Sequence, residues 1–399
     1  MATYSIPLGP AESLVELFSY PNMPGSTEVL PETISHWFNQ TIVRDGFGAK
    51  GATASVRVIG GQYTLELDGP AELEAYTSRL PQFLEHGRAA LEVQKSLVDA
   101  KPDKPWPKWV KPPLADKLWD PQDTGSWRFF LPFGMAMVNQ KALNFFHYPP
   151  MRLLDAMRDY LDDPVPVRLI ELMKANGIET DEEAWLYSTV MDGAPIAAPD
   201  DQGTIYKPNG DFSNPVHLIP IQHFHDYQRA QVELLLNVSE ACEDHTVPMV
   251  VYGTPARDTF NELYGGDQEL RSGHVMSVEI IEGKQTAVLS SGHPYAFYAQ
   301  VQAEVGSGSI LPEKWPTAIK TMAKDLVVVR WQHQMAEDPT QDPDDVLADC
   351  QKYWGDKKQR NTVAALALHQ GSLLYPDPNS LQFHFALSLK EAEARVENA

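Results

Sequence analysis

Three short segments of the sequence gather side chains that can donate, accept or hold a proton. They are Gly134-Met-Ala-Met-Val-Asn139, Gln222-His-Phe-His-Asp226 and Ser290-Ser-Gly-His-Pro-Tyr295. Each follows an apolar run that we interpret as a buried strand, namely Arg128–Phe133, Val216–Ile221 and Thr286–Ser290. In open parallel α/β sheets, ligands bind at the carboxyl ends of the strands. We therefore expect amide, imidazole and aromatic groups to meet at one edge of a sheet.

An aromatic segment, Asn144-Phe-Phe-His-Tyr148, lies close behind the first of these strands. Its rings Phe145, Phe146 and Tyr148 either stack on a planar ligand or belong to the core. The amides of Asn139 and Gln222 likewise either bind a ligand or satisfy backbone groups at strand ends. The residue types alone leave both interpretations open.

The histidines also raise the possibility of a metal site. In an extended segment His223 and His225 share one face, as metal ligands can, with Asp226 beside them. A metal-dependent hydrolase is therefore an alternative, although the sequence has no HExxH spacing. A serine hydrolase is disfavoured because the G-x-S-x-G pattern is absent, and the lack of Walker A and G-x-G-x-x-G loops argues against nucleotide cofactors.

The elements that must position these groups alternate between strand and helix. After Val216–Ile221 we expect a helix at Tyr227–Glu243, a strand at Val247–Tyr252, a helix at Pro255–Tyr264 capped by Thr254, and a strand at Thr286–Ser290. Such alternation is typical of right-handed crossovers. The predicted fold class is α/β, a three-layer α/β/α arrangement with a mostly parallel central sheet and additions at both ends.

Three units are expected along the chain: an accessory region at 1–118, an α/β core at 119–330 and a helical extension at 331–399. The first contains a hairpin, Thr53–Ile59 and Gln62–Leu67 around Gly60-Gly61, and a helical pattern from Pro70 to about Ala100. Within the core, Met151–Leu161 is a helix candidate, and an acidic, loop-rich region follows to about Pro215. Further helices are predicted at Trp315–Lys324 and Pro343–Trp354.

Charge is the most unusual feature of the composition. With 32 Lys+Arg against 54 Asp+Glu, the formal net charge is -22, which argues against an indiscriminate phosphate binder. The distribution is uneven, because the proline- and tryptophan-rich segment 101–113 carries four lysines, Lys101, Lys104, Lys108 and Lys111, against one acid, Asp103. This segment is either a basic arm that contacts nucleic acid or a solvated linker. The lysines Lys314, Lys320 and Lys324 form a second candidate patch.

The cysteine count and the absence of long apolar runs bear on location. Two cysteines, Cys242 and Cys350, cannot form a disulfide framework or a cysteine-rich zinc site. No stretch approaches the ~20 apolar residues needed to cross a bilayer, and no signal peptide is indicated. We expect a cytoplasmic protein with no membrane partner.

The order of these segments resembles the uracil-DNA glycosylase superfamily, in particular its single-strand-selective branch. Val288-Leu-Ser-Ser-Gly-His-Pro294 is similar to the family's final strand and His-Pro loop. Pro248-Met-Val-Val-Tyr-Gly-Thr-Pro-Ala-Arg257 is similar to its penultimate strand and helix start. The similarity spans about residues 126–300. It implies hydrolysis of the N-glycosidic bond of a flipped base, with DNA as partner and no metal or redox cofactor.

The resemblance also implies roles for individual residues. His293 would stabilise the departing base and Asn139 would position water, as the two catalytic groups. The base would be held by Gly134, Met135 and Gln222 and by one or more of Phe145, Phe146 and Tyr148. Contacts to DNA are expected from Thr254, Pro294 and Tyr295 and from the arm lysines Lys104, Lys108 and Lys111.

Departures from the family pattern bear on the substrate. Ala136, Met137 and Val138 stand where the family has Asn-Pro-Gly, Gln222 stands where it has Asn, and Tyr295 replaces Ser. Altered base-reading loops suit a larger or modified base. The resemblance extends to prokaryotic glycosylases that act against phages with modified DNA, and repair of uracil or deaminated bases is the competing role. A non-catalytic binding protein is the remaining alternative.

Overall fold

A computed structural model describes most of the C-terminal two thirds of the chain and parts of the N-terminal third. The described residues are 2–11, 14, 31–32, 34–35, 53–69, 81, 85, 140–147, 164–192, 206–207, 219–220, 225–239, 242–294, 296–297, 312–371, 373–374, 384–385 and 389–397. The expected strand at 128–133, the arm at 101–113, the helix at 151–161 and nearly all of the helix at 70–100 lie outside these residues.

The N-terminal strands form a small antiparallel sheet in the order β1-β3-β2. Its strands are β1 (Ala2–Pro10), β2 (Thr53–Ile59) and β3 (Gln62–Gly69). Gly60 and Gly61 adopt φ values of 60° and 80°, as the two central residues of a type I′ hairpin turn require. The predicted hairpin is confirmed, and β1 is an additional strand that sequence patterning did not reveal.

The main sheet has five strands in the order β5-β4-β8-β10-β9. The strands β4 (Leu143–Phe146), β5 (Thr189–Asp192), β8 (Met249–Tyr252) and β10 (Lys284–Ser291) run parallel, and only β9 (Val275–Ile281) is antiparallel. The predicted α/β class with a mostly parallel sheet is therefore confirmed. The strands expected at 247–252 and 286–290 are β8, its central strand, and the neighbouring β10.

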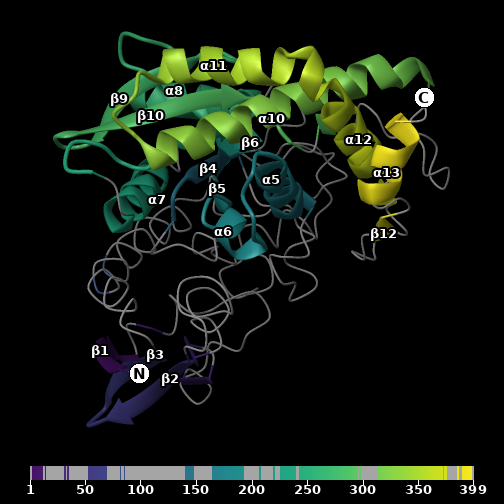
Figure 1. Ribbon diagram of the computed structural model, residues 1–399. Helices are drawn as coiled ribbons and strands as arrows, with labels where there is room; N and C mark the ends of the chain where they lie inside the picture. Colours follow the sequence, from purple (N-terminus) through teal and green to yellow (C-terminus); the bar gives the residue numbers. More distant parts are fainter. Residues whose placement is uncertain are drawn as a thin grey trace, which may run out of the picture.

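Helices connect the strands and follow the last of them (Figure 1). Those between strands are α5 (Pro164–Ala175), α6 (Asp181–Trp185), α7 (His225–Val238) and α8 (Thr254–Tyr264). After β10 come η6 (Pro312–Lys314), α10 (Trp315–Glu337), α11 (Pro343–Gly355), η7 (Lys357–Gln359), α12 (Arg360–Gly371) and α13 (Leu389–Glu397). Two short strand pairs, β6 (Tyr206–Lys207) with β7 (Ile219–Pro220) and β11 (Leu373–Leu374) with β12 (His384–Phe385), complete the described elements.

Successive residues of the parallel strands alternate between two apolar clusters, as the pleat of a strand requires. Phe145, Val251 and Val288 belong to a cluster that includes Val232 of α7 and Phe260 of α8. The neighbouring strand residues Phe146, Val250, Tyr252 and Leu289 belong to a second cluster supplied by α5, α10, α11 and α12. Both sides of these strands are thus buried, as expected for a parallel sheet.

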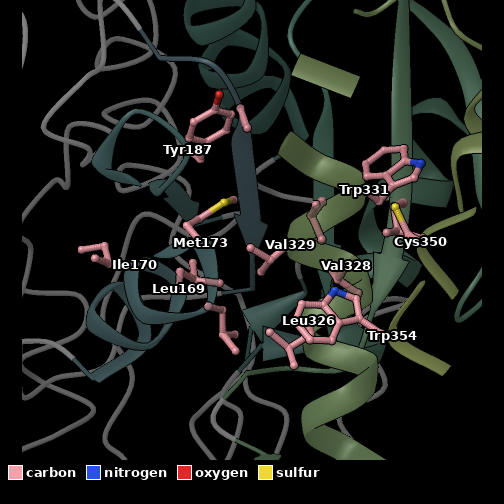
Figure 2. Packing of buried hydrophobic residues seen from close by; sticks show 14 of the residues in the cluster. Leu169, Ile170, Met173, Tyr187, Leu326, Val328, Val329, Trp331, Cys350 and Trp354 are labelled. Atoms are coloured by element: carbon pink, nitrogen blue, oxygen red, sulfur yellow. The ribbon is translucent and has the colours of Figure 1, made fainter. Parts of the chain in front are cut away.

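The second cluster is closed largely by C-terminal helices. Figure 2 shows Leu169 and Met173 of α5 facing Val329 and Leu326 of α10, with Trp354 of α11 packed beside them. Trp331 is fully buried, and its indole N–H donates to the carbonyl of Pro343 at 3.0 Å. The boundary expected between 330 and 331 falls inside α10, so that the C-terminal helices belong to the packing of the core.

Three local expectations need correction. The expected strand Val216–Ile221 is reduced in the described residues to β7, which pairs with β6 and not with the main sheet. The region to Pro215 is less loop-rich than expected, since it contains α5, α6 and β5; Pro164 in the first helical turn is compatible with a helix. Leu143–Phe146, expected to follow a strand, itself forms the strand β4.

Candidate functional site

Three parallel strands bring their carboxyl ends to one edge of the main sheet. There β4 ends at Phe146, β8 ends at Tyr252 and β10 ends at Ser291, two residues before His293. Because β8 pairs with both β4 and β10, these ends are neighbours in space. We call this group of residues the carboxyl edge.

The imidazole of His293 is held against aromatic rings at the carboxyl edge. It meets the ring of Phe146 at an edge-to-face angle of 70°, with ring centroids 5.1 Å apart. Phe146 in turn stacks on Tyr252 with centroids 4.8 Å apart. Both supporting rings are buried, whereas His293 is exposed. The fold therefore presents one oriented imidazole to solvent on an apolar support.

The start of α8 lies directly beside this histidine. Gly253 has φ 87°, and a Cβ at this position would lie 3.7 Å from the Cβ of His293. Gly253, and not the expected Thr254, is the N-cap residue, so no side chain caps the helix; Thr254 is its exposed first residue. The uncapped N–H groups and the positive end of the helix dipole favour a negative charge next to the imidazole.

A buried ion pair lies behind the carboxyl edge. The guanidinium of Arg168 on α5 is fully buried and bonds the carboxylate of Asp325 on α10 and the amide oxygen of Gln370 on α12. It also lies over the ring of Phe297, 4.2 Å from the centroid, four residues after His293. Burial raises the pKa of Asp325, and the charge of Arg168 opposes that rise. The pair thus joins α5, α10 and α12 to the segment that carries His293.

The Tyr252 hydroxyl is buried in this region without a hydrogen-bond partner in the described part of the chain. Burial raises the pKa of this phenol well above its ordinary value, and the nearby carboxylate of Asp325 adds to the effect. The group therefore stays neutral, and its O–H is a donor that no described residue accepts. A hydroxyl buried without a partner typically lowers stability.

The structure brings only some of the expected site residues together. His293 and Phe146 lie in contact, and Pro294 is buried next to them. Phe145 is fully buried among the residues that pack on α7 and α8, and Phe146 is 4% exposed, so neither ring has an open face for a planar ligand. Phe145 is a core residue and Phe146 is the support of His293. Outside the described residues lie Asn139, Gly134, Met135, Tyr148, Gln222, Tyr295, Lys104, Lys108 and Lys111.

The reason for placing Gln222 at this edge is wrong. That placement required Val216–Ile221 to be a strand of the main sheet, and β7 belongs to a separate pair of strands. In addition, Nε2 of His225 lies 3.2 Å from the carboxylate of Glu262. Glu262 is eight residues along α8 from the carboxyl edge, so the start of α7 lies away from that edge.

The metal alternative loses its geometric basis at the same place. The alternative assumed an extended segment, whereas His225 is the first residue of α7. His223 lies outside the described residues. Burial lowers the pKa of His225. Among the residues that the structure describes, no group of three histidine, cysteine or acidic side chains is placed to hold a metal ion.

Sequence reasoning missed Arg168, Asp325 and Tyr252. An arginine inside Pro-Val-Arg-Leu-Ile is a signal in retrospect, since a charged residue within an apolar run needs a buried partner. Tyr252 precedes the glycine that starts α8, the position of a strand end. Asp325, however, is separated from Arg168 by 157 residues, so no local pattern pairs them.

Comparison with known proteins identifies no relative. No family model matches the chain, and neither does any curated protein or solved structure. Among the described helices, none is both long and apolar enough to cross a membrane.

Proposed function

We propose that this chain is a DNA glycosylase that hydrolyses the N-glycosidic bond of a flipped base and leaves an abasic site. The observation that supports the proposal most is the exposed imidazole of His293, oriented by Phe146 beside the uncapped start of α8. Both features favour an anion at the same point. The departing base in this reaction is such an anion.

The proposed reaction breaks one bond to C1′, forms another from water, and transfers one proton. As the bond from C1′ to the base nitrogen breaks, the base takes the electron pair and the sugar becomes cationic. Water then adds its oxygen to C1′, and the proton that it loses ends on the base. His293 stabilises the negative charge on the base while that charge develops, which is worth ~3–4 kcal/mol for one well-placed donor.

The fold inferred with this function is a three-layer α/β/α core. Its support is the alternation of strand residues between the cluster with α7 and α8 and the cluster with α5, α10, α11 and α12. Asn139 as the water-positioning group and Gln222 as a base-reading amide remain part of the proposal from family resemblance alone.

The substrate that we propose is a modified base in phage DNA, in a cytoplasmic defence role. Its support is the divergence of the segment 134–139 and the replacement of Ser by Tyr295. Uracil or another deaminated base is the alternative substrate, and one experiment separates the two.

The test incubates the full chain with single- and double-stranded oligonucleotides that carry uracil, hypoxanthine, 5-hydroxymethyluracil or 5-hydroxymethylcytosine, and with DNA from phages that modify their bases. Abasic sites are detected by alkaline cleavage, with and without EDTA. We expect EDTA-insensitive release of a modified base, slowed ~100- to 1,000-fold by His293→Ala.

The matched control is His274→Ala, which removes another exposed imidazole and should leave the rate unchanged. No release from any substrate, or equal rates for His293→Ala and the wild type, would contradict the proposal. Release of uracil alone would retain the activity and replace the substrate.

A further inference from the structure

We infer that the chain binds the DNA backbone on a second surface, where α11 gives way to α12. We define this α11–α12 corner as Lys352, Lys357, Lys358 and Arg360, with Tyr353 and Arg330 between them. The inference rests on the proposed function for the choice of DNA as the polyanion. It differs from that function because it concerns binding of unmodified backbone away from His293.

Charge changes sign along α11. Residues 337–349 contain Glu337, Asp338, Asp342, Asp344, Asp345 and Asp349 and no Lys or Arg, whereas residues 350–360 contain four basic residues and one acid, Asp356. The four basic side chains are exposed, and within the described residues none of them forms an ion pair. In a chain with net charge -22, such a corner is a local exception.

Helix electrostatics do not account for this basic group. Lys352 lies in the last turn of α11, where a cation is favourable. Arg360, however, is the first residue of α12, and Lys357 and Lys358 lie just before it in η7, where the positive end of the α12 dipole disfavours cations. Asp356 offsets part of this charge and also accepts a hydrogen bond from the backbone N–H of Lys358. A bound anion would relieve the remaining repulsion, as phosphate does at helix N-termini.

An aromatic ring completes the corner. Tyr353 is 39% exposed although it is large and partly apolar. The guanidinium of Arg330 lies 3.9 Å from its ring centroid, and Trp354 meets it edge-on with centroids 5.1 Å apart. The ring is thereby fixed next to the cations, an arrangement that suits a sugar or base beside a contacted phosphate.

Further lysines extend from the corner toward the carboxyl edge. From Arg330, the exposed Lys324 is six residues away along α10, a rise of ~9 Å, and the exposed Lys320 is one turn further. Next to Lys324 is Asp325, which pairs with Arg168 behind His293. Likewise, α12 starts at the corner with Arg360, and Gln370, ten residues further along this helix, bonds Arg168. The rise along α12 from Arg360 to Gln370 is ~15 Å.

These lengths predict how long a DNA must be to contact both the carboxyl edge and the α11–α12 corner. A rise of ~15 Å corresponds to four or five nucleotides at ~3.4 Å per step along one strand. A DNA that ends within about three nucleotides of the reacting base should not reach the corner. Longer DNA should bind both surfaces.

The experiment measures binding of the full chain to a fluorescent, unmodified duplex of about 40 base pairs, by anisotropy between ~50 mM and ~200 mM salt. We expect Lys358→Glu to weaken binding about three- to tenfold, and Lys357→Glu/Lys358→Glu by more than tenfold. Loss of each phosphate contact should lower the slope of log K against log salt by about one. The control Lys284→Glu makes the same charge change at the far end of β10 and should weaken binding less than about twofold.

Equal weakening by Lys358→Glu and Lys284→Glu would reduce the effect to net charge and overturn the inference, and so would an absence of wild-type binding at ~50 mM salt. Failure of the proposed function looks different, because it leaves corner-dependent binding in place with no abasic sites from any modified base. Excision from a short substrate at saturating enzyme should not change in the corner variants.

Discussion

At both edges of the main sheet, a histidine meets an aromatic ring edge to face. At the carboxyl edge His293 lies 5.1 Å from Phe146, and before β5, at the opposite amino edge, His333 of α10 lies 5.2 Å from Tyr187, both between ring centroids. The surroundings differ. His293 is exposed on buried rings, whereas His333 is half-buried and burial lowers its pKa.

The exposure of the ion pairs at the two edges is the reverse of that of the histidines. At the carboxyl edge the side chain of Arg168 is fully buried and that of Asp325 is 14% exposed, whereas Lys141 and Glu337 at the amino edge are 39% and 53% exposed. The tyrosine hydroxyls at the two edges also differ in hydrogen bonding. That of Tyr252 lacks a partner among the described residues, whereas that of Tyr187 donates to Glu337 at 2.9 Å. The amino edge is thus a satisfied structural cluster, and the carboxyl edge keeps a solvent-facing imidazole and an unused donor.

The largest difference between the edges should appear when each ion pair loses its cation. Arg168→Met leaves the buried Asp325 carboxylate unpaired and should lower the free energy of unfolding by ~3–5 kcal/mol. Lys141→Met breaks an exposed pair and should cost less than about 1 kcal/mol. Urea denaturation measures both. The double variant Arg168→Met/Asp325→Leu should recover most of the loss, and equal losses at the two edges would remove the contrast.

The two tyrosines should respond to the same substitution with opposite sign. Tyr252→Phe removes a buried hydroxyl without a partner, so stability should be unchanged or rise by up to ~1 kcal/mol. Tyr187→Phe removes the bond to Glu337 and should cost about 1 kcal/mol, a value reduced by the exposure of that carboxylate. Thermal and urea unfolding of both variants provide the comparison. A loss at Tyr252 as large as that at Tyr187 would mean that its hydroxyl is hydrogen-bonded.

The smallest effect concerns pH and the amino edge. Burial lowers the pKa of His333 below 6.5, with Lys141 and Arg330 acting in the same direction and Glu337 and Glu183 opposing them. The folded state then binds fewer protons than the unfolded state below that value, so this histidine makes stability fall as the pH falls. His333→Gln should flatten the decline in unfolding free energy between about pH 7 and about pH 5. An unchanged slope would show that His333 is not desolvated.

Local sequence patterns predicted the elements whose signals are local. Gly60-Gly61 identified the first hairpin, and the apolar strand Met249–Tyr252 followed by Pro255 identified β8 and α8. The edge strand β9 was missed although Met276, Val278 and Ile280 alternate with Ser277 and Glu279, a pattern typical of a half-buried strand. The helix α5 was missed because it lies in a region expected to be acidic and loop-rich; Pro164 and Pro166 lie in its first turn, where proline is tolerated.

The candidate site was predicted only in part for a similar reason. His293 followed from the end of β10, which is a property of one strand. The role of Phe146 depends on β4, whose four residues Leu143–Phe146 were expected to follow a strand and not to form one. The strand expected at 128–133 lies outside the described residues. The partners of Arg168 depend on helices 157 and 202 residues away, so they require the tertiary fold.

The bond between Arg168 and Gln370 also bears on the order in which the protein is made. Its two ends are 202 residues apart, so at ~5–20 residues per second the ribosome needs roughly 10–40 s after Arg168 to synthesise the partner. For most of that interval neither Asp325 nor Gln370 has been synthesised, because Asp325 follows Arg168 by 157 residues. The segment carrying His293 emerges before its support is complete. The protein should therefore acquire an ordered carboxyl edge only after residue 370 has been synthesised and has left the ribosome.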